Sequence, residues 1–105
     1  LEQVRSVLRA AILTGHAHSN DVAAMFSMHS RTMSRHLEKQ GVSFQGLLDQ
    51  CRFEVAKQLL QKPNIEVGFI AETLKFADAS SFTRTFKRWS AATPTQWRTT
   101  YNTHN

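Results

Sequence analysis

Two segments of this chain carry the same pattern of apolar and basic residues, and this internal repeat limits the folds open to it. In each copy, two adjacent apolar residues precede an arginine that stands between two larger apolar side chains. The first copy comprises Val22, Ala23, Met33, Arg35 and Leu37, and the second comprises Ile70, Ala71, Phe82, Arg84 and Phe86. The offset is 48 residues at the start and 49 at the arginine, so the second turn holds one extra residue. The repeat predicts two related helix-turn-helix units.

Apolar residues recur at helical spacing along the whole chain, and no stretch shows the period of two that is typical of a strand. The helices that we expect cover residues 2–14, about 22–27, 31–40, 44–62, about 65–74, 79–90 and 94–101. The fold should therefore be all-α, with about seven helices forming two helix-turn-helix subdomains joined by a spacer helix.

Capping signals mark the ends of these helices. The expected N-caps are the run 19–21, Ser30, Ser43, Asn64, Asp78 and Thr93, the last followed by Pro94 and Gln96. Gly15 and Gly41 supply the expected stops, and Pro63 follows the end of the spacer. Residues 1–42 would then form the first unit with a leading helix, 43–62 the spacer, 63–101 the second unit with a closing helix, and 102–105 a frayed tail.

The second helix of each unit has an apolar back and a basic front. At about 100° per residue, Arg84 lies about 200° from Phe82, and Arg35 lies about 200° from Met33. Thirteen Lys and Arg residues against eight Asp and Glu give a net charge of +5, and no acidic residue follows Asp78. These faces predict an anionic partner. The DNA major groove, which is wide enough to admit a helix, is the partner that we expect.

Other reactive residue types are expected to serve the structure. Cys51 lies on an apolar stripe and should be a core residue, and a single cysteine permits no intrachain disulfide. We expect His16 and His18 to be solvated loop residues and not metal ligands, because no third ligand is nearby. Helical spacing also favours a core position over base stacking for the large aromatic residues Phe82, Phe86, Trp89 and Trp97.

Other classes of function fit the sequence less well. An enzyme would need a nucleophile with a base, paired carboxylates or a glycine-rich phosphate loop, so we expect no catalytic residue and no cofactor. No apolar run approaches the roughly 18–20 residues of a membrane span, and the basic residues are divided among several short helices. A helical protein–protein interaction module with a basic face remains the alternative, although it gives no reason for arginines at matching points of two repeats.

The segments SFTRTFKRWSAATPTQWR and LLDQCRFEVAKQLL resemble the AraC/XylS family of bacterial transcription regulators. The resemblance covers about residues 4–98 and is most specific from Phe76 to Arg98. It implies a cytoplasmic, nucleoid-associated regulator in which this domain binds double-stranded promoter DNA. It also implies RNA polymerase as a partner and an effector-sensing or dimerisation domain on the N-terminal side, which fits a chain that begins at Leu1 and not at Met.

The resemblance further implies which residues contact DNA. By position, base contacts are expected from Arg31, Thr32, Ser34, Arg35, Ala79, Ser80, Thr83 and Arg84. Phosphate contacts are expected from Ser30, Lys39, Lys75, Lys87 and Arg88. A spacer of about 18 residues is roughly 27 Å long, and adjacent major grooves on one face lie about 34 Å apart. One monomer is therefore expected to occupy two adjacent grooves.

The chain departs from the family pattern in its two turns. The family often has glycine in both, where this chain has Ser27 and Lys75. A positive φ at Lys75 would cost about 1 kcal/mol relative to glycine, and its ammonium group offers a phosphate contact. Glu38 stands where the second unit has Lys87, so the first unit is expected to bind the DNA backbone less strongly.

Overall fold

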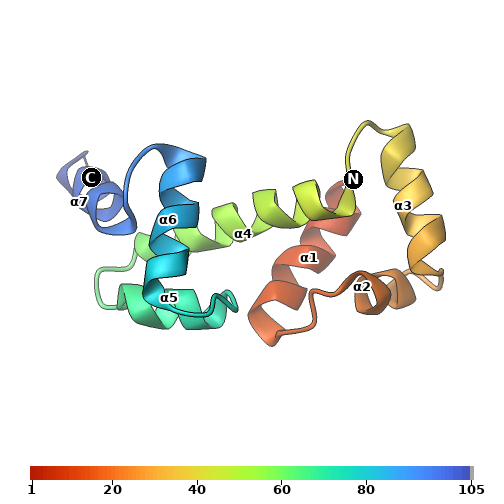
Figure 1. Cartoon of the computed structure of the whole chain (residues 1–105), viewed down its shortest axis with the longest axis horizontal. Helices are drawn as coiled ribbons and strands as arrows, with labels where there is room; N and C mark the ends of the chain where they lie inside the picture. The colour runs from red at the N-terminus through yellow and green to blue at the C-terminus, as the bar shows by residue number, and fades with distance from the viewer. Residues whose placement is uncertain (105) are drawn as a thin grey trace. The chain divides into compact units, whose positions relative to one another are not determined.

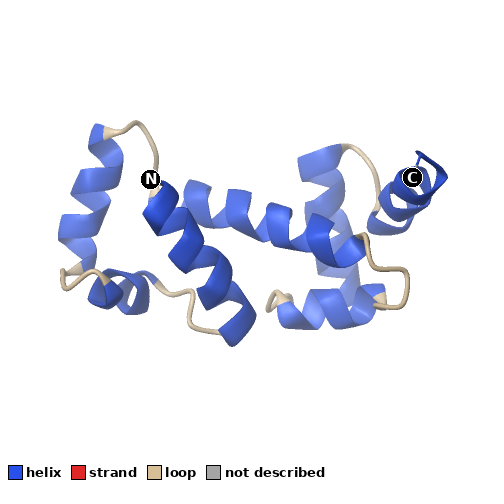
Figure 2. Cartoon of the chain, turned by 180° about the vertical axis from the view of Figure 1, so that it is seen from behind, coloured by secondary structure: helices blue, strands red, loops and turns tan. Residues whose placement is uncertain are grey.

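The computed structural model describes the backbone of residues 1–104 and the side chains of residues 1–102. Within this part of the chain there are seven helices and no strand, which confirms the all-α prediction (Figures 1 and 2). The helices are α1 (Glu2–Thr14), α2 (Ser19–Met25), α3 (Ser30–Lys39), α4 (Phe44–Leu60), α5 (Val67–Thr73), α6 (Ala79–Ser90) and α7 (Pro94–His104). They form two compact units, Leu1–Arg52 and Phe53–Asn105, so that the division falls within α4.

Unit 1, residues 1–52, has a core of aliphatic side chains. Its fully buried members come from one face of each helix and are Leu8, Ala11, Ile12, Val22, Ala23, Met33, Leu37, Leu47 and Cys51. The spacing of three and four residues within α1 and α3 brings these side chains onto a single face. Burying that face stabilises the pair α2–α3 against α1 and the first half of α4.

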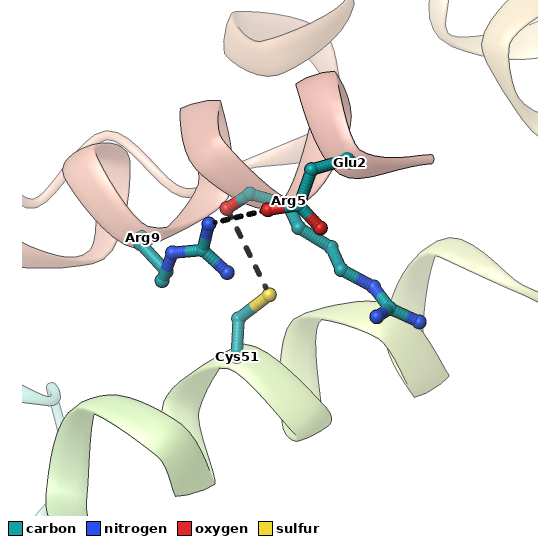
Figure 3. Close-up of polar contacts among 4 residues, drawn as sticks. All are labelled: Glu2, Arg5, Arg9 and Cys51. Atoms are coloured by element: carbon teal, nitrogen blue, oxygen red, sulfur yellow. Dashed lines mark hydrogen bonds and ion pairs between the residues drawn. The ribbon is translucent and has the colours of Figure 1, made fainter.

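Cys51 joins α4 to α1 in this core. Its side chain is completely buried, and its Sγ lies 4.0 Å from the carbonyl oxygen of Arg5 (Figure 3). Beside this contact, on α1, Arg9 Nη2 donates to Glu2 Oε1 at 2.9 Å. The structure confirms Cys51 as a small core residue.

Unit 2, from residue 53 onward, has an aromatic core. The side chains of Phe82 and Phe86 on α6 are fully buried, as are the smaller Ile70 of α5 and Leu60 of α4. Around them the rings form edge-on and tilted pairs: Phe53 with Phe86 and with Trp89, Phe76 with Phe82 and with Trp89, Phe82 with Phe86, and Phe86 with Trp97. Such pairs add about 0.5–1.5 kcal/mol each beyond their buried area. The predicted core role is confirmed for Phe82 and Phe86, whereas Trp89 and Trp97 are half-buried and pack against this core with their rings.

Three predicted N-caps have the expected hydrogen bonds. Asp78 accepts from the Ser81 amide at 2.7 Å, and Ser43 Oγ accepts from the Gly46 amide at 3.0 Å. At α7, Thr93 Oγ1 accepts from the Gln96 amide while Gln96 Oε1 accepts from the Thr93 amide, which is a complete capping box.

The predicted starts of α2, α3 and α5 are wrong. These helices begin at Ser19, Ser30 and Val67, so Ser30 is a helical residue and Asn64 lies outside the helix. The residues at the N-cap positions are His18, His29 and Glu66, all with extended backbone and without a side-chain capping bond. The end of α4 also differs from the prediction, because this helix ends at Leu60 instead of Lys62.

Helix α7 continues to His104, beyond the end expected at residue 101. Of the tail that we expected to be frayed, residues 102–104 are therefore helical, and Asn105 lies outside the described residues. Helices α2 and α3 thus begin earlier than predicted and α7 ends later, whereas α5 begins later than its predicted cap, Asn64.

Candidate nucleic-acid interface

The turn between α2 and α3 and the turn between α5 and α6 have the same backbone geometry. Ser27 and Lys75, which lie 48 residues apart, both have positive φ, at 57° and 67°. The Ser27 amide donates to Ala24 and the Lys75 amide donates to Glu72, each at 3.0 Å. The following amides reach back five residues, from Met28 to Ala23 at 3.1 Å and from Phe76 to Ala71 at 3.0 Å. Both turns therefore close as Schellman motifs with a left-handed residue, a conformation that favours glycine.

The second turn has its extra residue between the left-handed position and the next helix. Met28 alone separates Ser27 from the N-cap His29, whereas Phe76 and Ala77 separate Lys75 from the N-cap Asp78. This arrangement explains why the offset of the repeat changes from 48 to 49 residues. It also gives α6 an acidic N-cap that α3 lacks.

Helix α3 presents a polar front opposite a buried back. Met33 and Leu37 are 3% and 2% exposed, whereas the predicted base-contacting residues are exposed or, for Ser34, half-buried. The exposed members are Arg31, Thr32 and Arg35, and Lys39 is exposed at the end of the helix. In the described part of the chain, no ion pair joins Arg35 to Glu38.

A hollow lies at the start of α3. It is an open depression of about 480 Å³, lined by Asn20, Ala24, Ser27, Met28, His29 and Ser30. The half-buried Ser30 is at the first helical position, where amides have no partner within the helix. The expected phosphate contact at Ser30 therefore borders an open hollow with both polar and apolar lining residues.

Helix α6 repeats this division with a more basic front. Phe82 and Phe86 are fully buried, while Ala79, Ser80 and Arg84 are exposed and Thr83 is half-buried. Arg84 Nη2 donates to Ser81 Oγ at 3.4 Å, which leaves the rest of its guanidinium facing solvent. Lys87 and Arg88 are exposed in the last turn, where a positive charge interacts favourably with the helix dipole.

Asp78 is the one acidic group at the start of this basic helix. The Ser81 amide that donates to the carboxylate, together with the Ser81 hydroxyl, lowers the pKa of Asp78 below its ordinary value, with Arg84 adding a smaller effect. The carboxylate is thus charged at neutral pH and occupies the N-terminus of α6. The basic residues Arg84, Lys87 and Arg88 lie further along α6 and are exposed.

The structure places all the predicted site residues on two surfaces. Those of unit 1 lie on α3, and those of unit 2 lie on α6 with Lys75 in the turn before it. No cluster of three His, Cys, Asp or Glu residues suitable for a metal ion occurs among the described residues. None of the helices in that part of the chain has the length and apolarity that a membrane span needs.

Sequence reasoning gave no role to one residue that the structure makes prominent. Arg98 on α7 is half-buried, and its guanidinium binds two backbone carbonyls, those of Leu60 and Ile65. The only signal in the sequence was its position beside Trp97 in the segment that carries the family resemblance.

Comparison with known proteins decides the family. A family model described as a helix-turn-helix domain matches residues 22–100. The chain belongs to the AraC/XylS-type helix-turn-helix regulators. The AraC/XylS family consists of transcription regulators and not of enzymes. Sequence-specific binding of double-stranded DNA is the function of such a domain, and the protein-interaction alternative is not favoured.

Individual relatives agree with this assignment to the AraC/XylS family. The HTH-type transcriptional regulator VirS of Mycobacterium tuberculosis is 30% identical over 97 residues, which cover 92% of this chain and 28% of VirS. The C-terminal domain of the two-component response regulator yesN from Fusobacterium nucleatum superposes with a TM-score of 0.76 at 28% identity, covering 92% of this chain and 95% of that one.

A DNA-binding transcriptional dual regulator from Escherichia coli K-12 has a TM-score of 0.80. It is 21% identical, with coverage of 95% of this chain and 93% of that one, and shows the shared fold alone. The chain spans 22–28% of the length of the curated regulators that it matches first.

Proposed function

We propose that this domain reads DNA with two helices, α3 and α6, which enter two adjacent major grooves from a single monomer. The observation that carries the proposal is the duplicated unit: two turns with the same hydrogen bonds, each followed by a helix with a buried back and a basic front. The proposed base contacts come from Arg31, Thr32, Ser34 and Arg35 on α3, and from Ala79, Ser80, Thr83 and Arg84 on α6. A helix with such a front fits the major groove, where base edges present a readable pattern of donors and acceptors.

Contacts to the DNA backbone supply the salt-dependent part of the affinity in this proposal. We assign them to Ser30, Lys39, Lys75, Lys87 and Arg88. All five are exposed or half-buried, and four carry positive charge. Phosphate contacts position a protein on the duplex without reading sequence.

Two adjacent grooves on one face of the duplex are about 34 Å apart. The 17 residues of α4 correspond to about 26 Å of helix, and the reading helices add their own width. The proposal thus requires that the units bind together on one face of DNA, as a pseudo-dimer within one chain.

The full regulator is proposed to act in the cytoplasm, associated with the nucleoid. RNA polymerase and an N-terminal effector or dimerisation domain are its proposed partners. Related regulators are several times longer than this chain, which leaves room in them for such a domain.

Selection of binding sites from a random DNA pool tests the proposal. We expect enrichment of two unlike half-sites about ten base pairs apart, the spacing of one helical turn. A single enriched half-site would contradict the use of both units, and no enrichment would contradict sequence-specific binding.

The variant Arg84→Ala tests which of the two half-sites α6 reads. We expect discrimination at one or two base pairs to weaken by about 1–3 kcal/mol, the size of one good bidentate contact. Thr100→Ala, an exposed substitution on α7, is the matched control and should leave the selected sequence unchanged. An unchanged half-site in Arg84→Ala would show that Arg84 does not read a base.

A further inference from the structure

Arg98, on α7, binds the C-terminal end of α4. Its Nε donates to the carbonyl oxygen of Leu60 at 2.9 Å, and its Nη2 donates to the carbonyl oxygen of Ile65 at 2.6 Å (α7 and α4 are labelled in Figure 1). Leu60 is the last residue of α4, so its carbonyl has no partner within the helix. Ile65 lies in the segment that connects α4 to α5.

These two hydrogen bonds are of the strong kind. The donor is a permanently charged guanidinium, and the acceptors are at the negative end of a helix and in the loop that follows it. The planar guanidinium can serve both acceptors at once, whereas a lysine ammonium at the end of a flexible chain would not hold both in one geometry. Arg98 thereby fixes the direction of α7 relative to the end of α4.

Within unit 2, the reading helix α6 contacts both of these elements. The Phe53 ring of α4 lies 5.4 Å from Phe86 and 5.5 Å from Trp89, with Lys57 Nζ 4.3 Å from the Phe53 ring. The Trp97 ring of α7 packs edge-on against the same Phe86 at 6.3 Å. The buried back of α6 is therefore held at Phe86 by both α4 and α7.

Arg98 and Trp97 are adjacent on α7, and together they complete a closed set of contacts. Trp97 contacts α6, Arg98 contacts the end of α4, and Phe53 of α4 contacts α6. From this arrangement we propose that Arg98 is a positioning residue for DNA reading: it sets the orientation of α6, and so the placement of Arg84, without touching DNA.

The physical reason is that base readout tolerates little displacement. A bidentate contact from Arg84 requires donor–acceptor distances near 2.9 Å at two atoms simultaneously. Releasing α7 from α4 would let the back of α6 shift on Phe53, and a shift of about 1 Å breaks such a contact. Phosphate contacts from flexible Lys87 and Arg88 side chains would survive the same shift.

This inference rests on the proposed reading role of α6, and Arg98→Met tests it. We call the half-site that α6 reads the second half-site, and the one that unit 1 reads the first. We expect discrimination between the selected DNA site and a site with altered bases in the second half-site to fall about tenfold. Discrimination at the first half-site, which unit 1 reads, should stay as in the wild type, as should the dependence of nonspecific binding on salt. Thr100→Ala is the matched control on the same helix.

Arg98→Lys keeps the charge and offers a single hydrogen bond, so its loss of discrimination should lie between wild type and Arg98→Met. It also serves as the test if Arg98→Met does not fold. Folding is followed through Trp89 and Trp97, because both tryptophans of the chain lie in unit 2. All binding is measured well below the unfolding temperature of each variant.

The outcomes separate the two proposals. If Arg84→Ala weakens discrimination at the second half-site while both Arg98 variants fold and discriminate like the wild type, Arg98 has a purely structural role and the inference is overturned. If Arg84→Ala itself changes nothing, the proposed function of α6 fails, and the inference fails with it.

Discussion

Ser27 and Lys75 have the same left-handed backbone conformation at equivalent points of two turns that lie 48 residues apart. Neither residue is glycine, although an L side chain in this region costs about 1 kcal/mol or more. One such residue stands directly before each of the two helices that are proposed to read DNA, and a third, Ala91, follows α6. At Lys75, the side chain carries a positive charge next to α6, and a phosphate contact by this charge would offset the backbone strain. At Ser27, the side chain lines the hollow at the start of α3.

Replacing the strained residues by glycine should therefore separate stability from binding. We expect both Lys75→Gly and its matched control Ser27→Gly to raise the free energy of unfolding by about 1 kcal/mol, because glycine enters this region without a steric penalty. Lys75→Gly alone should weaken DNA binding and reduce the salt slope by about one. Urea denaturation followed by circular dichroism and binding at several salt concentrations measure the two effects. Wild-type binding by Lys75→Gly would exclude a phosphate contact at this position.

The two units should differ in their salt-dependent affinity. Helix α6 carries Lys87 where α3 carries the exposed Glu38, so we expect unit 2 to displace more counterions from DNA when it binds. Removing positive charge from unit 2 should therefore reduce this counterion release more than removing it from unit 1. We expect Arg84→Ala with Lys87→Ala to flatten the logarithm of affinity against the logarithm of salt concentration more than Arg31→Ala with Arg35→Ala. Each pair removes two positive charges, which makes them matched. An equal loss of slope from both pairs would count against the asymmetry.

Acid should remove a stabilising contribution from Asp78. Its pKa is lowered in the folded protein from the ordinary value of 3.8, chiefly by the Ser81 amide, so the contribution is fully present above that value. It is lost as the pH falls below 3.8 through the lower folded pKa. Asp78→Asn retains a capping acceptor that does not titrate.

Thermal unfolding of wild type and Asp78→Asn, followed by tryptophan fluorescence between pH 2 and pH 7, checks this prediction. The midpoint of the wild type should fall relative to that of Asp78→Asn only at the acidic end. Asp78→Ala should have a lower midpoint at neutral pH because it lacks the cap. Parallel curves for wild type and Asp78→Asn over the whole range would show that the cap does not depend on the charge.

The thiol of Cys51 should be protected in the folded protein. Its side chain is completely buried between α1 and α4, and a thiol reagent must wait for unit 1 to open. We expect modification at neutral pH to be slow in buffer and fast in denaturant, with Cys51→Ala as the blank. Rapid modification of the native domain would contradict the packing of α1 on α4.

How much of this protein was predictable differs among its elements. The apolar stripes of α3 and α6 and the capping residues Asp78 and Thr93 were correctly predicted, because helical periodicity and a capping bond act over three or four residues. The starts of α2, α3 and α5 were not, because the polar run 19–21, Ser30 and Asn64 were good local caps that the folded backbone did not use. Extended residues one position before each helix took the N-cap position instead.

The sequence by itself determined the helices, their buried and basic faces, and the repeat that makes α3 and α6 equivalent. Each follows from the spacing of nearby residues along the chain. Only the tertiary structure decided that Lys75 is left-handed and that Arg98 binds Leu60, which is 38 residues away. The physical reason is that an unpaired carbonyl at a helix end can be satisfied by any donor that folding brings near it, and no local pattern specifies which donor that will be.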